Sequence, residues 1–137
     1  MAWKFWIDTG GTFTDCIALS PQGEELRVKT LSSSALRGNV VEVIDERRVR
    51  IDVAHAVCSG FYVGYGFRGG WVESRDKHAP TARVVGWDAE GGVLVLDGSV
   101  EGIEAGQLCE LQSPEEPPVL AARILTGKRL DEDLPKL

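Results

Sequence analysis

The sequence predicts an α+β protein that is rich in β-strands and has one helix near its C-terminus. Two observations predict this fold class. Along most of the 137 residues, apolar side chains occupy every second position and Gly-, Asp- or Ser-rich turns separate these runs, as is typical of half-buried strands. Near the C-terminus, residues 119–125 instead place apolar side chains at the spacing of a helical face.

Three strands are predicted at the N-terminus. Residues 3–8 alternate as the first strand, and a turn at Gly10 and Gly11 leads to a second strand over residues 15–19. A Ser-Pro-Gln-Gly turn then leads to a third strand over residues 25–31. Because Gly10 and Gly11 lack a Cβ atom, their turn can adopt positive φ angles, and its N–H groups can approach a bound group closely.

The middle of the chain, residues 38–112, predicts a compact β module inserted after these strands. One hairpin is expected over residues 40–53 and another joins residues 82–87 to residues 93–96, with a short strand at residues 107–111. We expect these strands to pair mostly with each other. The predicted domains are therefore residues 1–37, 38–112 and 113–137.

The helix is predicted to follow Ser113, which has capping-box spacing to Glu116 and is an N-cap candidate. Two prolines at positions 117 and 118 favour a later start of the regular turns, near Pro118. Gly127 is a natural helix stop. Arg123 is expected to be a solvated helix residue.

The N-terminal hairpin contains the candidate functional residues of the chain. Asp8 ends the first strand, Asp15 follows the turn, and threonines at positions 9, 12 and 14 surround the turn with hydroxyl groups. A carboxylate, bare amides and hydroxyls together suit a polyphosphate bound with Mg²⁺. From the spacing alone, a purely structural hairpin remains an open alternative.

The run Ile7-Asp8-Thr9-Gly10-Gly11-Thr12-Phe13-Thr14-Asp15 resembles the first phosphate-binding motif of the actin-like ATPase and sugar-kinase superfamily. Its Gly-Gly-Thr-Phe-Thr-Asp form is similar to the start of the hydantoinase A/5-oxoprolinase family. Residues 29–33 and 116–127 also resemble segments of that family. An Arg-Gly-Thr-Asn-type stretch and several hundred further residues are expected after such a segment, so the resemblance implies an N-terminal portion of a larger, two-lobed enzyme.

This resemblance implies an ATP-dependent hydrolase that opens a cyclic amide such as 5-oxoproline or hydantoin, with ATP and Mg²⁺ as cofactors. Asp8 would be the catalytic residue and the metal ligand. The predicted cofactor-binding residues are Asp8, Thr9, Gly10, Gly11, Thr12, Thr14 and Asp15, although Asp15 is also expected to brace the turn. Lys29 is expected to be a solvated strand lysine. The portion alone is expected to be inactive, because the remainder of the polypeptide would close the site. A sugar-kinase-like phosphotransferase and a non-catalytic β-rich interaction module are the alternatives.

Two other motifs match known chemistry less well. Gly64–Gly69 fits the dinucleotide pattern Gly-x-Gly-x-x-Gly, but no helix is predicted after it, so we expect a loop or bulge in which Tyr65 and Phe67 pack. Asp8-Thr9-Gly10 matches the aspartic-protease triplet, but one copy would need a symmetric dimer to supply the second carboxylate.

Composition argues against several other kinds of partner and site. The formal net charge of −6 disfavours nucleic acid and membrane surfaces as partners, and no apolar run approaches the roughly 20 residues of a membrane span. The cysteines at positions 16, 58 and 109 lack metal-ligand spacing, so we expect buried thiols in a reducing cytoplasm.

Overall fold

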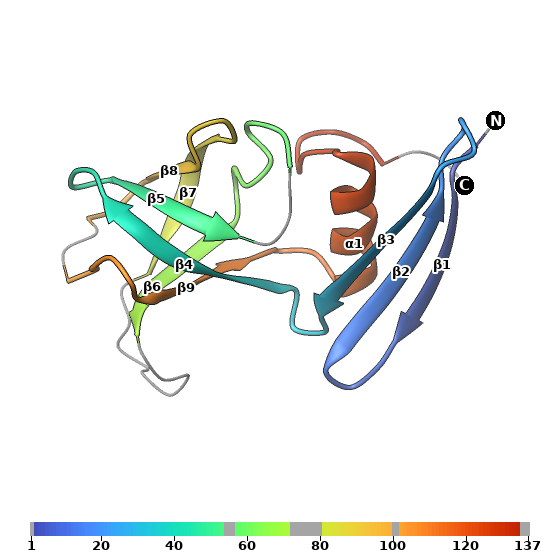
Figure 1. Cartoon of the computed structure of the whole chain (residues 1–137), viewed down its shortest axis with the longest axis horizontal. Helices are drawn as coiled ribbons and strands as arrows, with labels where there is room; N and C mark the ends of the chain where they lie inside the picture. Colours follow the sequence, from blue (N-terminus) through green and yellow to red (C-terminus); the bar gives the residue numbers. More distant parts are fainter. Residues whose placement is uncertain (1, 54–56, 72–80, 100–101, 135–137) are drawn as a thin grey trace.

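The computed structural model describes residues 2–53, 57–71, 81–99 and 102–134. It contains a three-stranded sheet, a closed six-stranded barrel and, within these residues, one α-helix that lies between the two (Figure 1). The predicted β-rich α+β class is therefore confirmed. The division into three domains stays a prediction.

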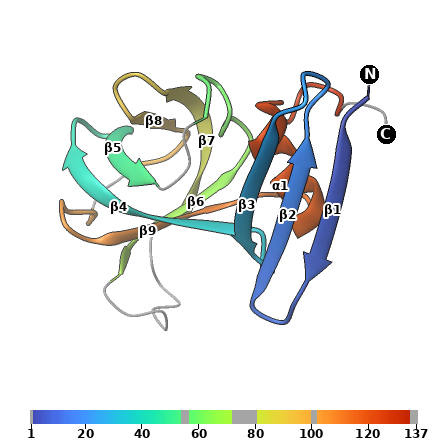
Figure 2. The same ribbon diagram turned by 45° about the vertical axis from the view of Figure 1, so that its right-hand side comes forward.

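The sheet is an antiparallel meander of β1 (Lys4–Thr9), β2 (Phe13–Leu19) and β3 (Glu25–Leu31), with β2 in the middle. Its second turn is closed by Ser20, whose Oγ accepts the N–H of Glu24 at 3.0 Å, and by Gly23 at a φ of 86°. The outer edge of the sheet is β1, on the side away from the barrel (Figure 2).

The barrel has the strand order β4-β5-β8-β7-β6-β9, and every neighbouring pair is antiparallel. Its strands are β4 (Ala35–Val43), β5 (Arg48–Val53), β6 (Gly66–Trp71), β7 (Thr81–Asp88), β8 (Val93–Leu96) and β9 (Leu108–Gln112). Closure removes the exposed sheet edges that would otherwise invite pairing with another chain. As expected, these strands pair with each other, and β4 continues directly from β3 without an intervening helix.

Strand β6 is a departure from the sequence prediction, which placed a loop or bulge at Gly64–Gly69. Gly66 pairs with Arg83 of β7 and with Gln112 of β9, so the glycine-rich run belongs to the barrel wall. A register shift between Gly69 and Trp71 does place a bulge in the strand. Three glycines in six residues masked the usual β-strand composition.

The barrel interior is filled by aromatic and aliphatic side chains. Phe61, Tyr62 and Tyr65 come from the segment before β6, and each is fully buried. Tyr62 packs edge-to-face on Trp87, with ring centroids 5.0 Å apart. Burial raises the pKa of Tyr65 to about 12. The packing predicted for Tyr65 and Phe67 is confirmed.

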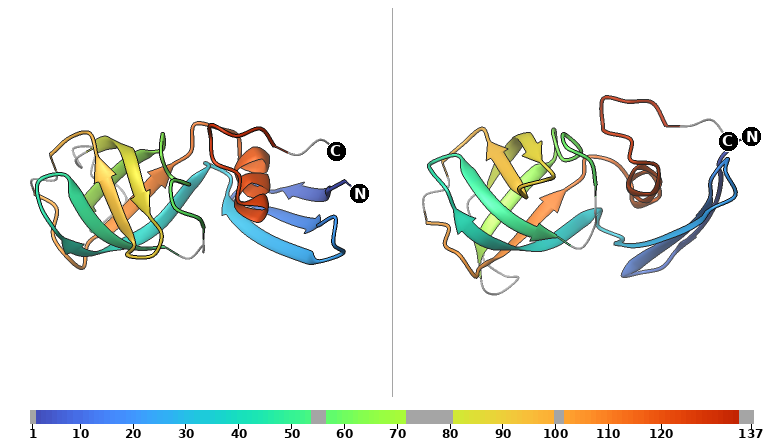
Figure 3. Two further views of the ribbon diagram at one scale, coloured as in Figure 1. Left: turned by 90° about the horizontal axis from the view of Figure 1, so that it is seen from above. Right: turned by 45° about the horizontal axis from the view of Figure 1, so that its top comes forward.

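Helix α1 (Pro117–Thr126) packs against both halves of the molecule (Figure 3, right). Leu120 joins the barrel core, whereas Ala121 joins a small cluster with Cys16 and Val28 of the sheet. The helix ends as predicted at Gly127, whose φ is 72°. Its predicted N-cap at Ser113 is wrong: the N-cap is Glu116, and the Oγ of Ser113 instead accepts the N–H of Glu115 at 3.1 Å.

Arg123 is not the solvated residue that the sequence predicted. Only 7 % of it is exposed, and its guanidinium forms an ion pair with Glu115. It also donates to the carbonyl oxygens of Arg129 and Glu132. Arg123 therefore holds the chain before the helix and the chain after it together. Helical periodicity alone could not reveal this, because both sets of partners lie outside the helix.

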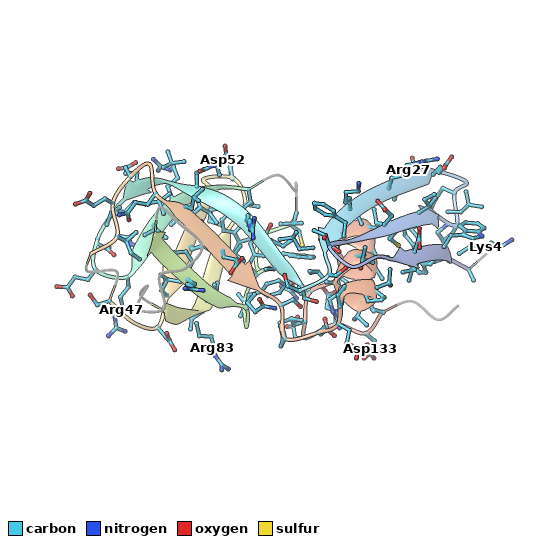
Figure 4. The ribbon with its side chains drawn as sticks, turned by 90° about the horizontal axis from the view of Figure 1, so that it is seen from below. Lys4, Arg27, Arg47, Asp52, Arg83 and Asp133 are labelled. Atoms are coloured by element: carbon cyan, nitrogen blue, oxygen red, sulfur yellow. The ribbon has the colours of Figure 1, made fainter. Side chains whose placement is uncertain are left out.

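Charged side chains on the barrel point outward, as Arg47, Asp52 and Arg83 do in Figure 4. The thiols differ from expectation in one case: Cys16 and Cys109 are buried, but Cys58 is exposed and its Sγ donates to the carbonyl of Gly127 at 3.4 Å. No helix of the described residues is long and apolar enough to cross a membrane.

Candidate phosphate-binding hairpin

The turn between β1 and β2 lies at one end of the sheet and extends into solvent (Figures 1 and 2). Every residue from Asp8 to Phe13 is exposed. The structure therefore brings Asp8, Thr9, Gly10, Gly11 and Thr12 together at one accessible tip.

The two acids of the motif face each other across the strands. Asp8 is the register partner of Asp15, and Asp15 is in turn the partner of Lys29. Paired residues of antiparallel strands point to the same face, so the three charged side chains form a row across the sheet. The Nζ of Lys29 lies 3.9 Å from the Oδ1 of Asp15 and 5.1 Å from the ring centroid of Phe13.

The row leaves Asp8 as the carboxylate without a countercharge. Asp15 has Lys29 beside it, whereas no ion pair involves Asp8 among the residues that the structure describes. Both partners of the Lys29–Asp15 pair are more than half exposed, so the pair stabilises the sheet by little. Asp8 is thus the carboxylate of this row that has no cation beside it, and its role as metal ligand stays a prediction.

The turn presents unpaired backbone donors. The N–H of Gly10 donates to the carbonyl of Phe13 at 2.9 Å. Within the described parts of the chain, the N–H groups of Gly11 and Thr12 have no partner. Exposed backbone N–H groups are donors that a phosphate oxygen can accept from.

The turn does not use the positive φ angles that its glycines permit, since neither Gly10 nor Gly11 adopts one. A Cβ atom built on Gly10 would lie 3.1 Å from the carbonyl oxygen of Phe13, so this position is tight. A Cβ atom on Gly11 would meet nothing within 4 Å. Within the described residues, neither a positive φ nor a neighbouring atom requires a glycine at position 11.

Thr14 differs from its neighbours, because it is fully buried. Its Oγ1 shares a hydrogen bond of 3.1 Å with the Oγ of Ser32, which follows β3. Thr14 thus supports the turn through its hydrogen bond with Ser32. Asp15, which was also expected to support the turn, is exposed and lies beside Lys29. A direct role of Thr14 in phosphate binding stays a prediction.

Ser32 is the residue of this site that the sequence reasoning missed. Its N–H donates to the carbonyl of Thr12 at 2.8 Å, and its Oγ donates to the carbonyl of Gly10 at 2.9 Å. Ser32 lies outside the motif, 20 residues after Thr12, so only the pairing of β2 with β3 brings it to the turn. The predicted hairpin of residues 15–19 with residues 25–31, which the structure shows as β2 and β3, was the available signal.

Other candidate residues lie elsewhere. Gly64 and Gly66 line a cavity of ≈ 500 Å³ at the barrel together with Arg83, Asp97 and Gln112, and Asp8 is not among its lining residues. In the part of the chain that is described, no group of three or more His, Cys, Asp or Glu side chains is arranged to hold a metal ion.

Comparison with known proteins identifies the N-terminal part of the chain. Residues 4–60 match the family described as the hydantoinase/oxoprolinase N-terminal region. The match includes the whole hairpin and extends through β5, so it crosses from the sheet into the barrel. This match confirms the resemblance carried by residues 7–15. Neither the curated proteins nor the solved structures gave a match to the chain.

Proposed function

We propose that this chain contributes the phosphate-binding hairpin of an ATP-dependent hydrolase that opens cyclic amides of the 5-oxoproline or hydantoin type. The observation that carries the proposal is the exposed tip itself, where the carboxylate of Asp8 lies beside the unpaired N–H groups of Gly11 and Thr12. The family of residues 4–60 supports the reaction class.

The residues at the tip fit a nucleotide bound with Mg²⁺. The amides of Gly11 and Thr12 and the hydroxyl of Thr12 would donate to phosphate oxygens, which are acceptors. Asp8 would hold the metal ion directly or through water, because Mg²⁺ in such sites takes one or two carboxylates and keeps several waters. The bound Mg²⁺ would neutralise charge on the phosphates during transfer.

The proposed reaction transfers the terminal phosphoryl group of ATP to the amide oxygen of the ring. The bond from that phosphorus to the bridging oxygen breaks, ADP leaves, and the ring carbon becomes electrophilic. Water then attacks this carbon, and the ring C–N bond breaks as the nitrogen takes up a proton from the added water, which leaves an acyl phosphate. A second water hydrolyses the acyl phosphate to the carboxylate and inorganic phosphate. In these steps the hairpin of this chain binds and orients the phosphates, and it does not contact the ring.

A second lobe would complete this site. The tip is exposed, and the described residues place no second set of phosphate donors over it. Phosphoryl transfer needs water to be excluded, which an open hairpin cannot do. We therefore expect the chain alone to bind Mg²⁺–ATP weakly and to have no hydrolase activity. Measurable Mg²⁺-dependent opening of 5-oxoproline or hydantoin by the purified chain would contradict this expectation.

The test of the proposed function is Asp8→Asn, which removes the charge and keeps the shape. In the complete enzyme, turnover should fall by an amount equivalent to about 2–4 kcal/mol of transition-state stabilisation. Asp52→Asn is the matched control, because Asp52 is also an exposed strand aspartate but points outward from the barrel (Figure 4). Equal turnover of the Asp8 variant and the wild type would contradict a catalytic or metal-binding role for Asp8.

A sugar-kinase-like phosphotransferase is the alternative to this hydrolase. Both enzymes would use the hairpin to bind ATP, so the two functions differ in the substrate that receives the phosphoryl group: a cyclic amide or a sugar. Steady-state assays of the complete enzyme with 5-oxoproline, hydantoin and a panel of hexoses decide this point. ATP consumption that depends on a hexose, and not on a cyclic amide, would overturn the proposal.

A further inference from the structure

The turn that presents the amides of Gly11 and Thr12 is held from outside by one residue. Ser32 binds the carbonyl oxygens of Gly10 and Thr12 with its hydroxyl and its N–H, at 2.9 and 2.8 Å. The same hydroxyl lies 3.1 Å from the Oγ1 of Thr14. Ser32 therefore contacts the backbone on both sides of Gly11.

These hydrogen bonds determine where the N–H of Gly11 points. The carbonyl of Gly10 and the N–H of Gly11 belong to one peptide unit, which is planar and trans, so they point in opposite directions. Because the carbonyl of Gly10 is directed to Ser32, the N–H of Gly11 is directed away from Ser32. It thus faces the outer side of the exposed turn, where a ligand can reach it.

The barrel holds Ser32 in place. The Nε2 of Gln112, the last residue of β9, donates to the carbonyl of Ser33 at 2.7 Å. The N–H of Ser113 donates to the carbonyl of Ser34 at 3.0 Å. Ser34 itself has a φ of 61°, a left-handed conformation that a non-glycine residue adopts only where its surroundings enforce it. The segment 32–34 is therefore fixed to β9 at one end and to the turn at the other.

We propose that Ser32 is a positioning residue that directs the N–H of Gly11 toward the phosphate of Mg²⁺–ATP, with the barrel as its support. This inference rests on the proposed function of the hairpin. Ser32 does not contact the ligand in this arrangement, since its polar groups are engaged with the turn.

The test compares Ser32→Ala with Ser33→Ala in the chain of residues 1–137, using Mg²⁺–ATP as the probe. Ser33 is the matched control, because it is exposed and its hydroxyl forms no hydrogen bond with the described residues. Two quantities are measured by NMR: the position of the Gly11 amide signal without ligand, and the affinity for Mg²⁺–ATP from amide shifts of the turn.

We expect Ser32→Ala to move the free Gly11 signal and to weaken Mg²⁺–ATP binding about tenfold, the factor that one hydrogen bond can supply. Ser33→Ala should behave as the wild type, and Ser32→Thr, which retains a hydroxyl, should restore most of the affinity. If Ser32→Ala does not fold, Ser32→Cys replaces it, because a thiol of similar size is only a weak donor.

The outcomes separate this inference from the proposed function. If the wild type binds and Ser32→Ala binds equally with an unchanged free Gly11 signal, the positioning role is wrong and the hairpin remains a phosphate site. If the wild type shows no shift with Mg²⁺–ATP, the proposed function fails. The ligand-free Gly11 amide signal then decides whether Ser32 orients the turn. A signal that moves in Ser32→Ala but not in Ser33→Ala supports this orientation, and a signal that stays in place in Ser32→Ala overturns it.

Discussion

The barrel and the sheet bury their apolar side chains in different ways. The barrel closes on itself around side chains such as Phe61, Tyr62 and Leu94, each of which is fully buried. The sheet covers one face with α1 and leaves the other open, where Trp6 is 55 % and Phe13 is 44 % exposed (Figure 3). The barrel therefore carries its own hydrophobic core, whereas the sheet depends on elements outside its strands.

This difference explains how α1 is used. The helix contributes Leu120 to the core of the barrel and Ala121 to the small cluster of the sheet. It covers the apolar face of a sheet whose own buried cluster is small. The turn at Gly11 lies at the end of this sheet, where Ser32 and, behind it, the barrel support it.

The largest expected effect contrasts two aromatic residues. Phe67→Ala, in the barrel, should lower the free energy of unfolding by about 3–5 kcal/mol, because Phe67 is 2 % exposed and its removal leaves a cavity. Trp6→Ala, on the open face of the sheet, should change it by less than about 0.5 kcal/mol. Urea denaturation followed by circular dichroism measures both. A loss for Trp6→Ala as large as that for Phe67→Ala would mean that the open face is covered in solution.

The next largest effect on stability is expected at Arg123, which connects the chain segments before and after α1. Arg123→Met should lower the free energy of unfolding by about 3 kcal/mol, the low end for breaking a buried ion pair, since Glu115 is partly exposed and can be hydrated. Arg27→Met, which breaks an exposed pair with Glu25 in the sheet, is the matched control and should cost under about 1 kcal/mol. Chemical denaturation of both variants gives the comparison, and equal small costs would show that Arg123 is not a structural joint.

The sequence was sufficient for most of the fold because the relevant signals are local. Alternating apolar residues predicted every strand except β6, and Gly127 predicted the end of the helix. The failures have a common cause. The strand pairing of β6 and the burial of Arg123 both depend on partners outside the element itself: strands β7 and β9 for β6, and residues on either side of the helix for Arg123. Neither periodicity nor composition records such partners.

The candidate site follows the same division. The residues of the motif from Asp8 to Thr12 could be assembled from the sequence, because one turn brings them together. The buried position of Thr14 and the contribution of Ser32 could not, since they result from the neighbouring strand β3. The turn does not use the positive φ angles that Gly10 and Gly11 permit, and the Ser32 hydrogen bonds to it could not be inferred from the motif alone.

A smaller effect is expected from the buried thiol of the barrel. Burial is the main cause that raises the pKa of Cys109 to about 12, from an ordinary value of 9.0. The folded chain therefore keeps this proton at a pH where the unfolded chain releases it. This contribution to stability is complete below pH 9 and is lost progressively as the pH rises toward about 12, by up to about 1.4 kcal/mol per pH unit.

Unfolding experiments between pH 8 and pH 11 test this dependence. The stability of the wild type should decrease more steeply with pH than that of Cys109→Ala. Cys58→Ala should follow the wild type, because Cys58 is exposed. Parallel curves for the wild type and Cys109→Ala would show that the thiol is accessible to water, and the barrel would then be less closed than its packing indicates.

The smallest effect on stability is expected at the tip of the hairpin. Gly11→Ala should change the free energy of unfolding by less than about 0.5 kcal/mol, because its φ is not positive and the added Cβ would meet nothing within 4 Å. Gly64→Ala, beside the barrel, should lower it by about 1–3 kcal/mol, since the φ is 94° and the Cβ would lie 2.9 Å from Leu130. Thermal unfolding distinguishes the two.

Mg²⁺–ATP binding should respond in the reverse order, with affinity lost in Gly11→Ala and kept in Gly64→Ala, because the methyl group at position 11 blocks the approach of phosphate to a free amide. Unchanged affinity in Gly11→Ala would place the nucleotide away from this turn.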